Sequence, residues 1–111
     1  MTTHESIHYR AADAFAQQIY QKYDDIVDDV VLYGSVARGE ERDIHSDVNL
    51  IVVLAEGVEK QAFEEPIREL AYDIELEFGV VLSLHILTTT EYHDDEPYLQ
   101  HVHQDAQPLY G

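Results

Sequence analysis

The 111-residue sequence contains no cysteine, which excludes disulfide bonds, thiolate metal sites and cysteine nucleophiles. Basic residues are scarce: 6 Lys and Arg stand against 23 Asp and Glu, which gives a formal net charge of −17. A surface of this sign repels free nucleic acid. We therefore expect no direct binding of nucleic acid, and carboxylates that are spread over the solvent-exposed face and screened by salt.

The acidic excess has two interpretations. It is typical of proteins adapted to the salt-rich cytosol of a halophile, and it also suits a surface that docks a basic partner. The salt dependence of stability separates them. A fold equally stable at low and at multimolar salt would count against halophilic adaptation.

Long apolar runs are missing as well. No stretch approaches the length needed to span a bilayer, and residues 1–6 lack the basic and then apolar pattern of a signal peptide. We expect a soluble, cytoplasmic protein. With 111 residues, of which 45% are hydrophobic and 26% are charged, the chain is expected to form one globular domain over residues 1–111.

The sequence does contain an alternation of helix-like and strand-like segments. Apolar residues recur every three or four positions in the segments 6–23 and 59–78, which predicts two amphipathic helices. Runs rich in β-branched residues predict buried strands at 26–33, 48–54 and 80–87. The predicted fold class is therefore α/β.

Smaller features mark the boundaries of these elements. Pro66 interrupts the second helix, and a kink or a start of the regular helix at Pro66 fits the sequence as well as a continuous helix does. Gly79 is expected to end this helix. The polar segment 36–45 predicts a short helix and a loop, and Thr90-Glu91 can cap a short helix before the C-terminal segment 99–110.

The first predicted strand ends at Gly34-Ser35, and this turn has the features of a phosphate-binding loop. Gly34 leaves room for a ligand beside the backbone, and a Gly-Ser turn offers free amide groups and a hydroxyl to phosphate oxygens. Arg38 would add positive charge, although it serves equally well as one of the few cations that balance surface carboxylates. A Gly-Ser turn alone is common, so it becomes specific only together with a second motif.

The second motif lies at the start of the second strand, where Ser46 and Asp47 are followed by Asn49. Asp47 and Asn49 are two positions apart on a strand, so their side chains project from the same face. Two carboxylates at this spacing would hold Mg²⁺ against a triphosphate and orient an attacking hydroxyl. In this sequence only Asp47 is a carboxylate.

Together the two motifs resemble those of a known family, the minimal single-domain nucleotidyltransferases of the DNA polymerase beta superfamily. The shared pattern is Gly-Ser, a downstream Gly and Ser-Asp on the next strand, found here as Gly34, Ser35, Gly39, Ser46 and Asp47. The order of helices and strands and the C-terminal segment 107–110 are similar too. The resemblance therefore covers essentially the whole chain.

This resemblance implies both a fold and a function. The fold would be a polymerase-beta-like nucleotidyltransferase fold, with a small mixed three-stranded sheet and helices packed on it. The ligands would be Mg²⁺ and ATP or another nucleoside triphosphate. Many such proteins are antitoxins that pair with a HEPN ribonuclease toxin and transfer AMP from ATP to a toxin tyrosine. The implied catalytic and metal-binding residues are Asp47 and Asn49, and the implied phosphate-binding residues are Gly34, Ser35, Arg38, Gly39 and Ser46.

Three departures from the family pattern bear on catalysis. Asn49 stands where the family has Asp, and a neutral amide holds a dication less strongly. The third strand offers Ser83 and His85 on the face where the family often has a carboxylate, which leaves His85 as a possible base. The loop between Ser35 and Asp47 is also longer than the common pattern.

These departures keep other functions open. The first hypothesis is an active nucleotidyltransferase that modifies a protein hydroxyl. The second is a binding module of the same fold that neutralises a HEPN toxin by occlusion, its acidic surface matching a basic ribonuclease. A third is that Asn49 is an engineered change that traps substrate.

The 7 histidines raise the question of a metal site. His4 and His8 share a predicted helical face, and His101 and His103 share a strand-like one. No recognisable metalloprotein spacing accompanies them, so we expect most histidines to be exposed and we expect no zinc or nickel site. Aromatic residues fall mostly at core spacing and are predicted to pack rather than to stack on bases.

Overall fold

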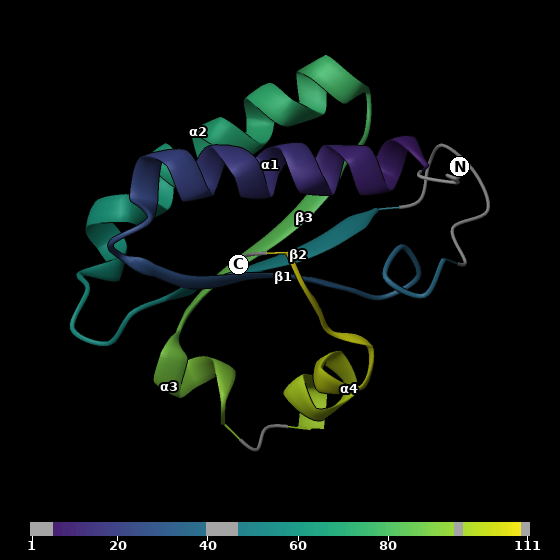
Figure 1. Cartoon of the computed structure of the whole chain (residues 1–111). Coiled ribbons are helices and arrows are strands. Elements are labelled where there is room, and N and C mark those ends of the chain that lie inside the picture. Colours follow the sequence, from purple (N-terminus) through teal and green to yellow (C-terminus); the bar gives the residue numbers. More distant parts are fainter. Residues whose placement is uncertain (1–5, 40–46, 95–96, 110–111) are drawn as a thin grey trace.

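The computed structural model describes residues 6–39, 47–94 and 97–109 of the chain. Along the sequence the elements are α1 (Ile7–Tyr23), β1 (Val27–Tyr33), β2 (Val48–Leu54), α2 (Lys60–Phe78), β3 (Leu82–Thr88), α3 (Thr89–Tyr92), α4 (Pro97–Asp105) and β4 (Gln107–Pro108) (Figure 1). The α/β class predicted from the sequence is confirmed. None of the described helices is long and apolar enough to cross a membrane.

The sheet is mixed and has the strand order β3-β2-β1-β4. β1 pairs with β2 and with β4 in antiparallel fashion, whereas β2 and β3 are parallel. The predicted count of three strands was wrong, because Gln107–Pro108 adds a fourth beside β1. A strand this short shows no alternation of apolar residues, so the sequence pattern does not reveal it.

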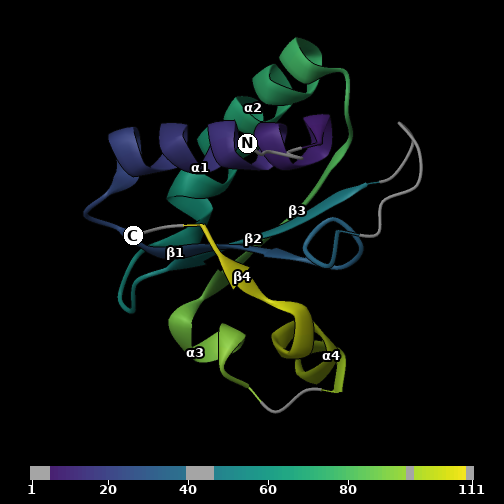
Figure 2. The same cartoon turned by 45° about the vertical axis from the view of Figure 1, so that its right-hand side comes forward.

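Two helical layers enclose this sheet. Helices α1 and α2 lie on one face, and α3 and α4 lie on the other (Figures 1 and 2). The larger core lies under α1 and α2 and includes Phe15, Ile19, Leu50 and Ile67. A smaller core on the opposite face is formed by Val31, Ile51, Val53, Leu99 and Val102. Alternate residues of β2 therefore enter different cores, as the period of a strand requires.

The long helices have clear ends. The Ser6 hydroxyl oxygen accepts a hydrogen bond from the backbone amide of Tyr9 at 3.1 Å and so caps the start of α1. Gly79 ends α2 as predicted: it adopts a φ of 70°, and its amide donates to the Glu75 carbonyl at 2.8 Å. Pro66 lies inside α2, which runs without a break from Lys60 to Phe78. Because Pro66 is exposed, water can satisfy the carbonyl that loses its helical partner.

Side chains of α2 also tie this helix to β3. The Glu75 carboxylate accepts a hydrogen bond from the amide of Leu82 at 2.7 Å. About two turns earlier in the helix, the Arg68 guanidinium donates to the carbonyl of Leu84 at 3.3 Å. These contacts fix α2 along the outer strand of the sheet.

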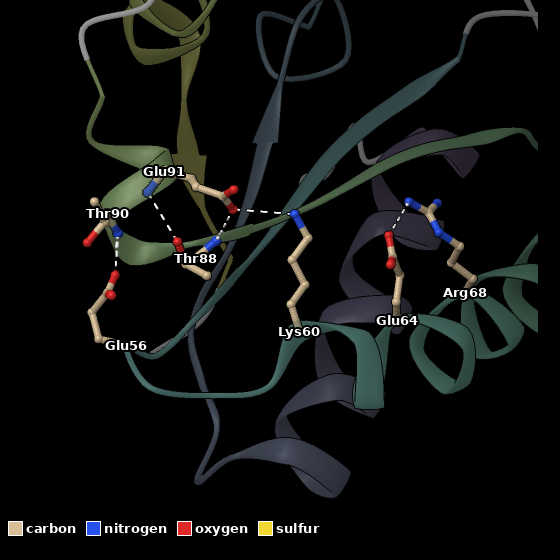
Figure 3. A network of polar contacts seen from close by, with 7 residues as sticks. All are labelled: Glu56, Lys60, Glu64, Arg68, Thr88, Thr90 and Glu91. Atoms are coloured by element: carbon tan, nitrogen blue, oxygen red, sulfur yellow. Dashed lines mark hydrogen bonds and ion pairs between the residues drawn. The ribbon is translucent and has the colours of Figure 1, made fainter.

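Helix α3 begins two residues earlier than the sequence indicated. Its cap is Thr88 rather than Thr90: the Thr88 hydroxyl accepts from the amide of Glu91, and the Glu91 carboxylate accepts from the amide of Thr88. Glu91 also lies 3.4 Å from Lys60, and the amide of Thr90 donates to Glu56 (Figure 3). This polar network joins α3 to the connection between β2 and α2.

Candidate nucleotide site

The turn after β1 is compact. Gly34 has a φ of 82°, a left-handed conformation that favours glycine. The amide of Arg38 donates to the Gly34 carbonyl at 3.1 Å, and the amide of Gly39 donates to the Val36 carbonyl at 3.1 Å. Val36 is 3% exposed and belongs to the larger core, so it anchors the turn. Within residues 36–39 the chain forms turns rather than the predicted helix; the rest of that segment lies outside the described residues.

A row of side chains crosses the sheet at the same level. Tyr33 of β1 pairs with Asn49 of β2, and Asn49 pairs with Ser83 of β3. Residues of β2 with the same parity as Asn49 enter the smaller core, so this row lies on the face that α3 and α4 cover. Ser83 and His85 share this face, as predicted. The row itself carries no carboxylate.

The turn and the second strand meet at Gly34 and Asn49. A Cβ atom placed on Gly34 would lie 2.6 Å from Nδ2 of Asn49, closer than real Cβ atoms come to a neighbour. The glycine thus leaves the space that the Asn49 amide occupies. The structure therefore brings together two of the residues that the sequence predicted for one site.

The remaining predicted residues lie around this contact. Asp47 is exposed and directly precedes β2, and Ser35 is half-buried at the start of the turn. Gly39 ends the turn with a φ of 71°. Ser46 lies outside the described residues. The roles of these residues in binding and catalysis stay predictions.

Arg38 has a partner that the sequence did not indicate. Its Nη1 atom lies 2.6 Å from Oδ2 of Asp105, the last residue of α4. The two residues are 67 positions apart, and no local pattern around Asp105 signals the pair. The ion pair connects the predicted phosphate-binding turn to the second helical layer.

The donor set decides which metal ion this region suits. Asp47 offers a carboxylate, and Asn49 offers an amide oxygen. Within the described ranges, no group of three or more His, Cys, Asp and Glu side chains lies together as a metal site would require. Mg²⁺ is often bound through one or two carboxylates together with substrate phosphates. The residues present therefore fit a magnesium ion that a bound nucleotide would help to hold.

His85, His93 and His103 are exposed, as expected for most of the histidines, whereas His8 is an exception. His8 is buried rather than exposed, and its Nε2 atom has no hydrogen-bond partner among the described residues. His103 lies on helix α4 rather than on a strand-like segment, and its Nε2 atom is 3.0 Å from the carbonyl oxygen of Tyr92. His4 and the side chain of His101 lie outside the described residues.

Two groups with a raised pKa, Asp29 and Tyr92, lie beside the smaller core rather than at the candidate nucleotide site. Partial burial raises the pKa of Asp29, although a hydrogen bond from the amide of Val30 opposes this effect. Partial burial also raises the pKa of Tyr92, and the negative charge of Asp29 adds to that shift. These groups affect stability and lie apart from the row through Asn49.

The mixed sheet, the glycine turn after β1 and the acidic start of β2 define a nucleotidyltransferase fold. The chain belongs to the nucleotidyltransferase domain family, whose pattern matches residues 13–105. Members of this family generally use a nucleoside triphosphate and a divalent metal ion.

A solved structure shows the same fold. It is described as "Crystal structure of the toxin-antitoxin with AMP-PNP", and one of its chains is similar to this one with a TM-score of 0.61 and 18% sequence identity. The similarity covers 89% of this chain and 73% of that chain. No curated protein matches the sequence.

Proposed function

We propose that this chain is the antitoxin of a toxin–antitoxin pair and that it transfers AMP from ATP to a tyrosine of a HEPN toxin. The family match and the similarity to a toxin–antitoxin structure with AMP-PNP support this proposal. The observation that carries it is the contact between Gly34 and Asn49. It joins a turn suited to phosphate to the strand that Asp47 precedes.

Each residue of the proposed site would have a separate role. The Gly34-Ser35 turn would offer backbone amides and a hydroxyl to the phosphates, and Asp47 would hold Mg²⁺ with help from the Asn49 amide oxygen. When bound, the metal ion neutralises charge on the triphosphate. The tyrosine oxygen would form a bond to the α-phosphorus as the bond to pyrophosphate breaks. His85 is the titratable side chain that β3 places on this face, and it would take the tyrosine proton.

A second function is favoured by one observation, the neutral side chain of Asn49. Its neighbours across the sheet, Tyr33 and Ser83, are neutral as well. Asp47 is therefore the single charged ligand in this set, and the site would hold a metal ion only weakly. In this version the chain keeps the nucleotidyltransferase fold, transfers no AMP, and neutralises the HEPN toxin by occlusion.

Labelled ATP distinguishes the two functions. The chain is incubated with labelled ATP, Mg²⁺ and a candidate HEPN toxin, and label on the toxin is measured. We expect transfer by the wild type, loss of transfer in Asp47→Ala and a gain in Asn49→Asp. Asp73→Ala, on the outer side of α2, is the matched control and should behave as the wild type.

The outcomes are separable. No label on the toxin from the wild type, with none gained in Asn49→Asp, would retire the transfer reaction. Neutralisation of the toxin by Asp47→Ala would then support occlusion. A failure of the wild type to neutralise the toxin at all would remove both functions.

A further inference from the structure

The ion pair of Arg38 and Asp105 lies where the predicted phosphate-binding turn meets the C-terminal end of α4. The two side chains are 42% and 26% exposed, so water and ions reach the pair. The backbone amide of Arg38 donates to the carbonyl of Gly34 at 3.1 Å, so the side chain extends from a backbone that belongs to the turn. Arg38 is thus the cation that this turn would present to a phosphate.

Asp105 is held firmly in its place. It ends α4, and two residues later Gln107 pairs with Leu32 of β1. The amide of Leu109 then donates to the carbonyl of Val30 at 2.7 Å. The carboxylate is therefore anchored to the same strand from which the turn departs.

A carboxylate and a phosphate make the same kind of charge-assisted hydrogen bond to a guanidinium. Asp105 and an incoming triphosphate would therefore compete for Arg38. Asp105 also cancels the positive charge that Arg38 would show to an anion. In a chain with a net charge of −17, little other positive charge compensates for this loss.

We propose that Asp105 lowers the affinity of the site for a nucleoside triphosphate by holding Arg38, and that a bound triphosphate takes Arg38 from Asp105. This inference rests on the proposed nucleotide site. When a triphosphate binds, the last turn of α4 therefore loses its contact with the turn after β1.

The experiment measures the Kd of ATP with Mg²⁺ by calorimetry for the wild type and for variants of Asp105. For Asp105→Asn we expect a Kd lower by about two- to fivefold, the range that an exposed ion pair allows. Asp105→Glu keeps the charge and should bind as the wild type does. Asp73→Asn makes the same change in net charge on α2, across the sheet, and should leave the Kd unchanged. If Asp105→Asn fails to fold, Asp105→Ala replaces it and should lower the Kd by the same factor.

An Arg38→Ala background provides the decisive comparison. There the substitution Asp105→Asn should have no effect on the Kd, because the residue through which Asp105 acts is gone. Equal Kd values for the wild type and Asp105→Asn, or a gain that persists without Arg38, would overturn the inference. ATP binding without AMP transfer would count against the proposed reaction alone, whereas absence of ATP binding in every variant would overturn both.

Discussion

The amide of Asn49 occupies the space that a side chain on Gly34 would need, with 2.6 Å between its Nδ2 atom and the position of that Cβ. Gly34→Ala should therefore force Asn49 to swing away, in addition to straining a backbone with a φ of 82°. The strain costs about 1–2 kcal/mol, and the displaced amide adds about 1 kcal/mol. Urea denaturation measures the sum.

Gly57→Ala is the matched control, because Gly57 has a φ of 87° but no atom within 4 Å of an added Cβ. Gly57→Ala should therefore lower the free energy of unfolding only by the cost of the strained backbone. In an Asn49→Ala background the difference between the two glycine variants should disappear. If the difference remains, the contact with Asn49 is not its cause.

The capping box at α3 gives a second prediction. Thr88→Ala removes the hydroxyl that accepts from the amide of Glu91, and it should lower the free energy of unfolding by about 1 kcal/mol. Thr90→Ala is the control, since the hydrogen bond of Thr90 to Glu56 uses its backbone amide. Comparable losses in the two variants would argue against Thr88 as the cap.

Glu91 adds a pH dependence to the same motif. The hydrogen bond from the Thr88 amide lowers the pKa of Glu91, with a smaller contribution from Lys60. A lowered carboxyl pKa stabilises the fold above the ordinary glutamate value of about 4.3, and this contribution is lost as pH falls through the lowered pKa. The free energy of unfolding of Glu91→Gln, measured between pH 3 and 7, should fall less steeply toward acid pH than that of the wild type. An unchanged slope would contradict this assignment.

Tyr92 should make the protein sensitive to alkali. Its pKa is raised by burial and by the charge of Asp29, so its contribution to stability is complete below the ordinary tyrosine value of about 10. That contribution is lost as pH rises through the raised pKa. Between about pH 9 and 11, the free energy of unfolding of Tyr92→Phe should therefore fall less steeply with rising pH than that of the wild type. The exposed Tyr72→Phe serves as a control and should keep the wild-type slope.

Salt should stabilise the fold, because 23 acidic side chains against 6 basic ones repel one another. Screening acts over about 10 Å at 0.1 M salt and over shorter distances at higher concentrations. We expect the midpoint of thermal unfolding, measured by circular dichroism, to rise from low to multimolar NaCl. A midpoint that does not change would remove the case for halophilic adaptation.

The main elements were predictable because each has a strong local pattern. The helices at 7–23 and 60–78 have one apolar face, and the three longer strands are runs of apolar residues bounded by turns. The cap of α3 was also readable, since Thr88 and Glu91 are three positions apart, which is the spacing of a capping box. The pair Thr90-Glu91 lacks that spacing.

Tertiary relationships were harder to predict. Gly34 and Asn49 belong to neighbouring motifs, so their meeting followed from the pairing of two predicted strands. The contact of Arg38 with Asp105 depends on where α4 returns to the sheet, and β4 sets that position with only two residues. Local periodicity contains no information about the contact between Arg38 and Asp105.

The contacts between α2 and β3 bear on the behaviour of the protein at high concentration. β3 is the last strand of the sheet on its side, and such a strand offers its backbone to any extended segment that meets it. Glu75 already engages the amide of Leu82, and Arg68 already engages the carbonyl of Leu84. A strand that paired with β3 would lack these two hydrogen-bonding partners. The contacts of α2 therefore disfavour the addition of further strands, and so fibril formation, at this edge of the sheet.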